Sequence, residues 1–204
     1  PEVEKVELIT RLIVDRKVSS DYSNPVEKIS SCAEIIRLPF GPKRYIRKEL
    51  LWPYLDDLAD QIVQRLQKEN NLPDWIHAHY ADAGYVAVRL SKLLNIPFVF
   101  TGHSLGREKK RRLLESGMVH SQIENTYSIT RRIEAEELAL NKANLVVTST
   151  LQESKQQYAR YRNFVANQAR VISPGVDLKR FYPSLKPEEM TDVNQLFQSF
   201  LRNP

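Results

Sequence analysis

A serine, a histidine and a run of basic side chains follow one another within residues 99–112, VFTGHSLGREKKRR. The GHSLG sequence in this segment matches the G-x-S-x-G turn that presents the nucleophilic serine of α/β-hydrolases after a strand. Such an enzyme needs an acid and then a histidine after the serine, from separate strand ends. After Ser104 the chain has one histidine, His120, and only Glu108 and Glu115 lie between them, in one short helical stretch. A serine α/β-hydrolase therefore remains only a distant alternative.

The basic side chains of residues 107–112 could instead contact the phosphates of a nucleic acid. No aromatic residue interrupts the run, and no nucleic-acid-binding signature occurs elsewhere in the chain. A charge run of this kind is most often the solvated face of a helix. We therefore predict that nucleic acid is not a partner.

Two further histidines, His77 and His79, stand two residues apart in a strand-like segment and point to the same side of that strand. They lack a third ligand at a recognisable spacing, so we predict no metal site. We expect His77 to be a packed, hydrogen-bonded histidine. His79 is closer to the strand end, and we predict that it binds substrate.

The segment 131–140, RRIEAEELAL, carries carboxylates of the kind that glycoside hydrolysis uses. That reaction needs two carboxylates facing each other across a cleft, and this pattern does not indicate such an arrangement. Arg132 and Glu136 are four residues apart, and Arg131 and Glu134 are three residues apart. These spacings favour simple surface ion pairs along one helix.

The elements that must position these residues follow from the hydrophobic periodicity. Short β-rich runs alternate with amphipathic helical patterns, which predicts an α/β fold with a Rossmann-like, doubly wound parallel sheet. Ligands of such a sheet bind outside the carboxyl ends of its strands. We expect strands within 5–14, 33–40, 74–80, 97–103, 144–150 and 169–175, helices within 51–66, 83–94 and 123–140, and a polar loop at 18–31.

The composition is that of a globular domain, with 204 residues of which 42% are hydrophobic and 27% are charged. No apolar run approaches the ~18 residues that span a membrane, so we expect no membrane association. The single cysteine, Cys32, fits a reducing compartment, and we expect a cytoplasmic protein. The net charge of +5 suits an anionic small ligand as well as a polyanion. The pattern opens directly on a strand and closes on a helix at 197–202 followed by Asn203 and Pro204, which predicts a fragment of a longer protein.

The strand-end segments together resemble the retaining GT-B glycosyltransferases of the sucrose-phosphate synthase family. TGHSLGR-x-K and K-E-x-L-W-P-Y are the specific motifs of this resemblance, whereas the P-G-V-D…F-x-P ending is general to a broad glycosyltransferase group. The resemblance covers nearly the whole chain through the segments 6–14, 39–55, 76–109, 127–140, 146–154 and 171–183.

The resemblance implies that residues 1–204 are an N-terminal, acceptor-binding, Rossmann-like domain that lacks the first strand and the glycine-rich loop of the family. The C-terminal domain, which binds the nucleotide sugar, is absent from the chain and would be its partner in the same protein. The implied reaction transfers glucose from UDP-glucose, or ADP-glucose, to fructose 6-phosphate with retention, giving sucrose 6-phosphate. The related synthesis of mannosylfructose phosphate uses the same acceptor and is the alternative. The resemblance implies no bound cofactor, because the nucleotide sugar is a substrate. Mg²⁺ is expected only as an ion that could stimulate the reaction.

Three cations match positions of the family that contact the phosphate or the sugar, namely Lys48, Lys109 and Arg132. A dianionic phosphate needs several fixed cations that also donate hydrogen bonds, so this set suits fructose 6-phosphate. Arg131 is adjacent, but neighbouring side chains leave a helix about 100° apart, so only one of the two arginines can face the site squarely. We choose Arg132.

His103 matches the family's histidine beside the transferred glucose, and we predict that it is the catalytic residue. The resemblance implies that the phosphate of the donor accepts the proton of the acceptor. No protein nucleophile is then required, so Ser104 is free to bind the acceptor.

Overall fold

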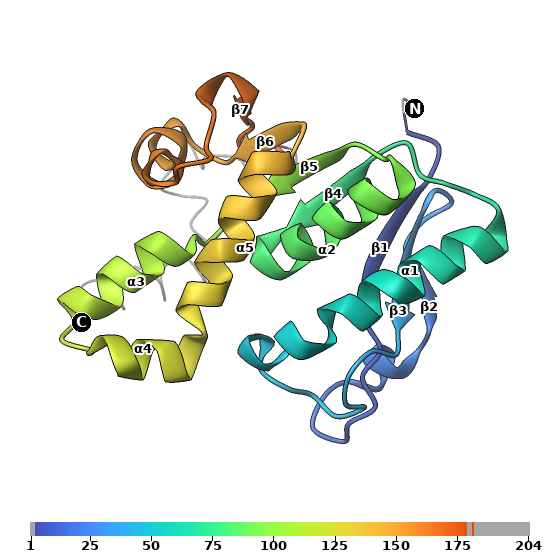
Figure 1. Cartoon of the computed structure of the whole chain (residues 1–204). Coiled ribbons are helices and arrows are strands. Elements are labelled where there is room, and N and C mark those ends of the chain that lie inside the picture. The colour runs from blue at the N-terminus through green and yellow to red at the C-terminus, as the bar shows by residue number, and fades with distance from the viewer. Residues whose placement is uncertain (1–2, 179–180, 182–204) are drawn as a thin grey trace, which may run out of the picture. The chain divides into compact units, whose positions relative to one another are not determined.

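A computed structural model describes residues 3–178 and residue 181 of the chain (Figure 1). The chain divides into two units, residues 1–172 and residues 173–204. In the second unit, the described residues 173–178 and 181 form neither a helix nor a strand. The helix expected at 197–202 lies outside the described residues. The fold and the site that follow belong to the first unit.

The first sheet has the strand order β1-β3-β2. β1 and β3 are parallel, whereas β2 is antiparallel to β3. β2 joins β3 through a short turn in which the N–H groups of Ile29 and Ser30 both donate to the carbonyl of Ala33. The region expected as a polar loop therefore contains a strand and a 3₁₀ turn. The bounds are β1 (Val6–Arg11), η1 (Ser20–Ser23), β2 (Val26–Lys28) and β3 (Ala33–Leu38).

The second sheet is entirely parallel and has the order β4-β5-β6-β7. Its strands are β4 (Ile76–His79), β5 (Phe98–Thr101), β6 (Leu145–Thr148) and β7 (Ala169–Val171). Each of the six expected strands is present, and the α/β class with parallel strands is confirmed. The strands are shared between two sheets rather than forming one continuous sheet.

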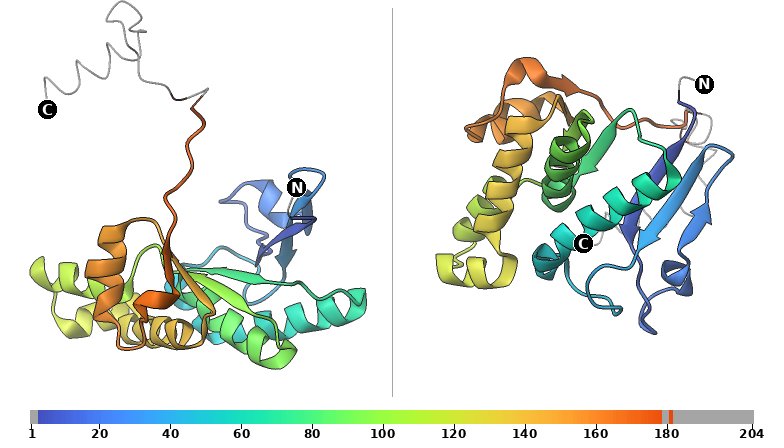
Figure 2. Two further views of the ribbon diagram at one scale, coloured as in Figure 1. Left: turned by 90° about the horizontal axis from the view of Figure 1, so that it is seen from above. Right: turned by 45° about the vertical axis from the view of Figure 1, so that its right-hand side comes forward.

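α1, α2 and α5 form a helical layer in which α2 lies between α1 and α5 and packs against β4 and β5 of the second sheet (Figures 1 and 2). α1 shares a buried cluster with Ile9 of β1 and Leu38 of β3, from the first sheet. The side chains of Phe98 and Phe100 in β5 are fully buried beneath this layer. Burial of each ring contributes about 1.5–3 kcal/mol to stability. The bounds are η2 (Lys48–Leu50), η3 (Trp52–Tyr54), α1 (Leu55–Glu69), α2 (Tyr80–Leu94), α3 (Gly106–Glu115), α4 (His120–Tyr127), α5 (Ile129–Lys142), η4 (Glu153–Gln157), η5 (Tyr158–Arg160) and η6 (Ala166–Gln168).

The single helix expected over 123–140 is two helices, because the backbone of Ser128 is left-handed, with φ 46° and ψ 46°. The N–H of Ser128 donates to the carbonyl of Glu124 and closes α4. The carboxylate of Glu124 then accepts hydrogen bonds from the N–H and the hydroxyl of Thr130, at 3.0 and 2.7 Å. Glu124 thus caps the first turn of α5, where N–H groups have no partner within the helix.

Within the part of the chain that the structure describes, no helix has both the length and the apolar composition needed to cross a bilayer.

Candidate functional site

An open pocket lies at the N-terminus of α2, directly after β4, with about 350 Å³ of space that includes adjoining solvent. This is the carboxyl end of a parallel strand, where ligands of open α/β sheets bind. The partial positive charge of a helix N-terminus favours anions at this place. The lining residues come from η2, η3, α2, α4 and α5, and they are Lys48, Glu49, Trp52, Tyr80, Ala81, Asp82, Tyr127 and Arg132.

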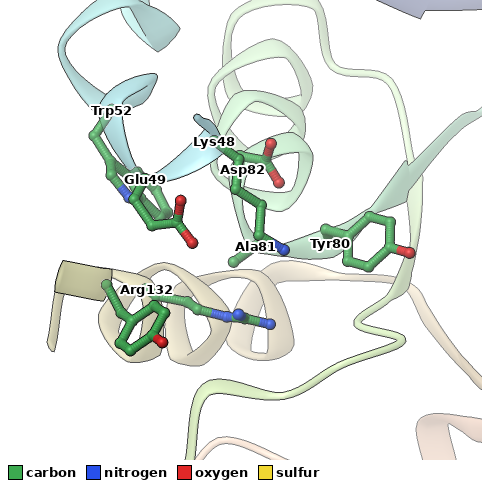
Figure 3. A pocket seen from close by; sticks show the side chains of 8 residues that line it. Lys48, Glu49, Trp52, Tyr80, Ala81, Asp82 and Arg132 are labelled. Carbon is green, nitrogen blue, oxygen red and sulfur yellow. The ribbon is translucent and has the colours of Figure 1, made fainter. Parts of the chain in front are cut away.

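Two of the predicted cations enter this pocket from different elements. Figure 3 shows Lys48 from η2 and Arg132 from α5 extending toward the same space, with the carboxylate of Asp82 beside Lys48. Burial raises the pKa of Asp82, while hydrogen bonds from backbone N–H groups and the charges of Lys48 and Arg132 oppose the rise. The pocket therefore combines two fixed cations with a carboxyl group that is more easily protonated than usual.

The third predicted cation, Lys109, is not among the residues that line the pocket but contacts two of them. Its Nζ atom lies 3.9 Å from Oε1 of Glu49 and 3.8 Å from the ring centroid of Tyr127, and both of these residues line the pocket. Burial lowers the pKa of Lys109, and the neighbouring positive charge of Arg132 lowers it further. The structure thus brings Lys48, Lys109 and Arg132 to one place, although they are far apart in the sequence.

The predicted histidines form a stacked row next to the pocket. Nδ1 of His79 lies 2.7 Å from Nε2 of His103, and the ring of His103 lies 4.7 Å from that of Tyr80, which lines the pocket. His77 stacks on His79 at 4.2 Å and makes the expected hydrogen bond, 2.9 Å from Nε2 to the hydroxyl of Thr101. His77 therefore has the expected hydrogen bond and ring packing, although the residue as a whole remains exposed to solvent.

Tyr80 and His103 both have left-handed backbones, with φ of 70° and 54°. This region costs an ordinary residue roughly 1–2 kcal/mol. Tyr80 directly follows β4, and His103 lies two residues after the end of β5. Strained residues of this kind cluster at functional sites, where the surrounding structure holds them in place.

The GHSLG turn is tied to the elements that follow it in the chain. The N–H of Gly102 donates to the hydroxyl of Tyr158 at 2.8 Å, and the N–H of Gly106 donates to the carboxylate of Glu136 at 2.9 Å. Burial raises the pKa of Tyr158 to about 12, so this hydroxyl stays neutral and keeps its proton. The turn is therefore a rigid link between β5 and α3.

Ser104 is exposed at the tip of this turn, beside the guanidinium of Arg132. Its carbonyl accepts a hydrogen bond from the guanidinium of Arg132, and its hydroxyl lies 3.4 Å from the same group. A guanidinium is always protonated in proteins and cannot serve as the general base that a serine nucleophile requires. The contacts of Ser104 thus give no support to the hydrolase alternative.

The two adjacent arginines of α5 separate as the helical period requires. Arg132 lines the pocket, whereas Arg131 is exposed and lies over the ring of Trp52, 5.7 Å from its centroid. The expectation that Arg132 and Glu136 form a surface ion pair is wrong. Arg132 is 7% exposed and Glu136 is 0% exposed, and their side chains meet at 3.0 Å inside the domain. α5 packs against α2 and α3, so the face that carries this pair is covered.

Sequence reasoning missed several residues of the pocket wall. Tyr80 and Asp82 belong to a strand-end segment that the sequence singles out, and Glu49 adjoins Lys48, so position alone could have indicated them. Tyr127 ends a helix whose termination at Ser128 the hydrophobic pattern does not show.

Among residues 3–178 and 181, no group of three or more histidine, cysteine, aspartate or glutamate side chains is arranged to hold a metal ion.

Comparison with known proteins gives this geometry its family context. The family described as the sucrose synthase first GT-B domain matches residues 3–196. The probable sucrose-phosphate synthase 2 of Arabidopsis thaliana is 42% identical over 190 residues, and the sucrose-phosphate synthase of Spinacia oleracea is 42% identical over 192 residues. Both alignments cover 80% of this chain and 18% of the relative, so the chain spans less than a fifth of these proteins.

Solved structures agree with this match. Sucrose-phosphate synthase from Thermosynechococcus elongatus aligns with a TM-score of 0.67 and 26% identity, over 97% of this chain and 42% of that one. Anabaena Alr3699/HepE, solved in complex with UDP-glucose, aligns with a TM-score of 0.51 over 81% of this chain and 36% of that one; at 19% identity this shows a common fold alone. The chain thus has the fold of a GT-B glycosyltransferase domain, and it belongs to the family of the sucrose synthase first GT-B domain.

Proposed function

We propose that the chain is the acceptor-binding domain of a sucrose-phosphate synthase, which transfers glucose from UDP-glucose or ADP-glucose to fructose 6-phosphate with retention. The observation that carries this proposal is the pocket at the N-terminus of α2, which Lys48 and Arg132 enter together. The 42% identity to two sucrose-phosphate synthases supports the same assignment.

The charges around the pocket suit a sugar phosphate. Lys48, Lys109 and Arg132 supply three positive charges, against the two carboxyl groups of Glu49 and Asp82. The raised pKa of Asp82 reduces the negative charge there, and the helix N-terminus adds positive potential. The 6-phosphate would lie among the cations, and the two carboxyl groups are suitable acceptors for sugar hydroxyls.

His103 would act where the two substrates meet. Its ring stacks near Tyr80 at the edge of the pocket and is held by His79. In the proposed reaction the acceptor hydroxyl forms a bond to the anomeric carbon while the bond from that carbon to the nucleotide phosphate breaks. The released phosphate oxygen takes the proton of the acceptor. His103 contributes by contacting the transferred sugar, and the nucleotide sugar is a substrate, so no bound cofactor is needed.

The partner of this domain would be a second domain of the same protein that binds the nucleotide sugar. Closure of two domains assembles the site and excludes water, so neither half should turn over alone. We expect release of UDP from UDP-glucose and fructose 6-phosphate by the complete two-domain protein, and negligible release by residues 1–204 alone. Comparable turnover by the chain alone would contradict the two-domain proposal. Activity only with a nucleotide-mannose donor would favour the mannosylfructose-phosphate alternative.

A further inference from the structure

Glu136 is a fully buried carboxylate that joins two separate parts of the site. Its Oε1 atom accepts hydrogen bonds from Nε of Arg132 and from the N–H of Gly106, both at 3.0 Å. Its Oε2 atom accepts from the same N–H of Gly106 at 2.9 Å and from the hydroxyl of Tyr161. Both oxygens are therefore occupied, by a helix N-terminus, a buried tyrosine and a guanidinium of the pocket.

The same carboxylate completes the first turn of α3. The N–H of Gly106 reaches Glu136 directly, and the N–H of Arg107 reaches it through the hydroxyl of Tyr161, at 2.9 Å. These are two of the N–H groups that a helix leaves without internal partners. A negative charge at this end of a helix is also favoured by the helix dipole.

The close approach of the two elements depends on the absence of a side chain at Gly106. A Cβ atom there would lie 2.8 Å from Oε2 of Glu136 and 2.9 Å from Cγ1 of Ile133. Both distances are shorter than the nonbonded contacts that a Cβ atom makes in proteins. α3 therefore meets α5 this closely only because residue 106 is glycine. The final glycine of GHSLG therefore serves this contact with Glu136.

Arg132 reaches the pocket with its orientation already fixed. Nε is bound by Glu136, and Nη2 donates to the carbonyl of Ser104 in the turn before α3. Arg132 as a whole residue is only 7% exposed, so few other positions are open to its side chain. Burial raises the pKa of Glu136, while Tyr161, Arg132 and Gly106 oppose the rise by stabilising the carboxylate.

We propose that Glu136 is a positioning residue that locks Arg132 and the turn 102–106 into one arrangement, ready for the phosphate of the acceptor. It acts through these groups and does not itself touch the substrate. The kinetic part of this inference rests on the proposed function. The structural part, that Glu136 orders the turn, stands on the contacts alone.

Kinetics of the complete two-domain protein test the link to Arg132. Glu136→Gln keeps the shape of the side chain, but it removes the charge and turns one acceptor into a donor. We expect the KM for fructose 6-phosphate to rise by about 10²-fold, as for misplaced binding groups, with a much smaller change for unphosphorylated fructose. Glu134→Gln, the same change at an exposed position of α5, should have no effect. In an Arg132→Ala background, Glu136→Gln should add little to the rise in KM. An equal effect in both backgrounds would overturn the proposal.

Hydrogen exchange of the same protein, followed by mass spectrometry, tests the turn without any substrate. Peptides that cover residues 102–107 should exchange about tenfold faster in Glu136→Gln than in Glu134→Gln or the wild type, because a buried acceptor is lost. If the wild type does not use fructose 6-phosphate, the proposed function fails while this result still decides the role of Glu136. An unchanged rate of hydrogen exchange in Glu136→Gln would overturn the proposed role of Glu136.

A second variant keeps the test decisive if Glu136→Gln does not fold. Tyr161→Phe retains the ring and removes only the hydroxyl that links Arg107 to Glu136. It should speed exchange of the same peptides and leave the bond between Arg132 and Glu136 in place, so the KM for fructose 6-phosphate should change by less than about tenfold. If these peptides exchange at the same rate in Tyr161→Phe as in the wild type, the proposed hydrogen-bond network of Arg107, Tyr161 and Glu136 is contradicted.

Discussion

Nδ1 of His79 and Nε2 of His103 lie 2.7 Å apart, so the ends of β4 and β5 are joined by a hydrogen bond between two imidazole rings. One ring must donate and the other must accept, because two donors or two bare lone pairs would repel each other. The pair therefore couples the tautomers of the two rings, because a proton on the facing nitrogen of one requires a bare nitrogen on the other. Protonation of both rings would place two N–H groups face to face and break the contact.

The arrangement predicts how the histidines titrate. Partial burial and the charge of His103 lower the pKa of His79, and partial burial, His79 and His103 lower that of His77. Proton NMR of the ring signals should show both groups titrating below the ordinary value of about 6.5. His103→Gln should raise the pKa of His79 toward that value. A pKa of His79 above 6.5 in the wild type would contradict the account.

The same shifts fix the sign of a stability effect. With folded pKa values below the unfolded one, the unfolded chain takes up protons first as the pH falls through 6.5, so the histidines make the fold less stable at lower pH. Urea unfolding at pH 7 and pH 5 measures this effect. Between these two pH values, the free energy of unfolding should fall less for His77→Gln than for the wild type. His120→Gln, a change at an exposed histidine at the start of α4, is the control and should follow the wild type.

His103→Ala should lower kcat more than it weakens acceptor binding. The ring is proposed to lie at the reacting centre, where its interactions strengthen in the transition state. Steady-state kinetics with fructose 6-phosphate, combined with direct measurement of acceptor affinity, separate the two effects. An unchanged kcat with weakened acceptor binding would move His103 to a binding role.

Ser104→Ala should keep substantial transferase activity. The hydroxyl of Ser104 lies beside the guanidinium of Arg132, and the serine carbonyl makes the firmer contact with that group. A serine nucleophile would lose on the order of 10⁶ in kcat. A loss of that size, or labelling of Ser104 by an organophosphonate, would restore the hydrolase alternative.

Much of the fold could be predicted because it depends on local patterns. Strand positions follow from apolar runs such as the one that ends at Thr101, and the location of the site follows from parallel strand ends. The break between α4 and α5 could not be predicted in this way. Ser128 breaks a continuous amphipathic pattern through a left-handed residue capped by Glu124, and nothing in the hydrophobic period marks it.

The prediction that Arg132 and Glu136 form a surface ion pair failed for a related reason. A spacing of four residues on a helix indicates that Arg132 and Glu136 are neighbours, but it does not show whether their face is exposed. Their burial depends on α3, which approaches α5 through Gly106, thirty residues earlier. Contacts across that distance come from the tertiary fold and have no local signal in the sequence.

The central claim is that the pocket at the N-terminus of α2 holds the phosphate of fructose 6-phosphate, and Lys109 and Lys110 test it most directly. Nζ of Lys109 contacts Glu49 and Tyr127 of the pocket wall. Lys109→Ala should cost roughly 2–4 kcal/mol with fructose 6-phosphate, the scale for truncated buried charge pairs, and should hardly affect the use of unphosphorylated fructose. Lys110→Ala should be nearly silent.

The measurement is the acceptor kinetics of both variants in the complete protein, with each acceptor, at low and high salt. If residues 107–112 were only a basic helix face, the two lysines would be interchangeable, and each loss would be small and dependent on salt. We predict a severe, phosphate-specific defect for Lys109→Ala alone. Equal behaviour of Lys109→Ala and Lys110→Ala would contradict the phosphate site.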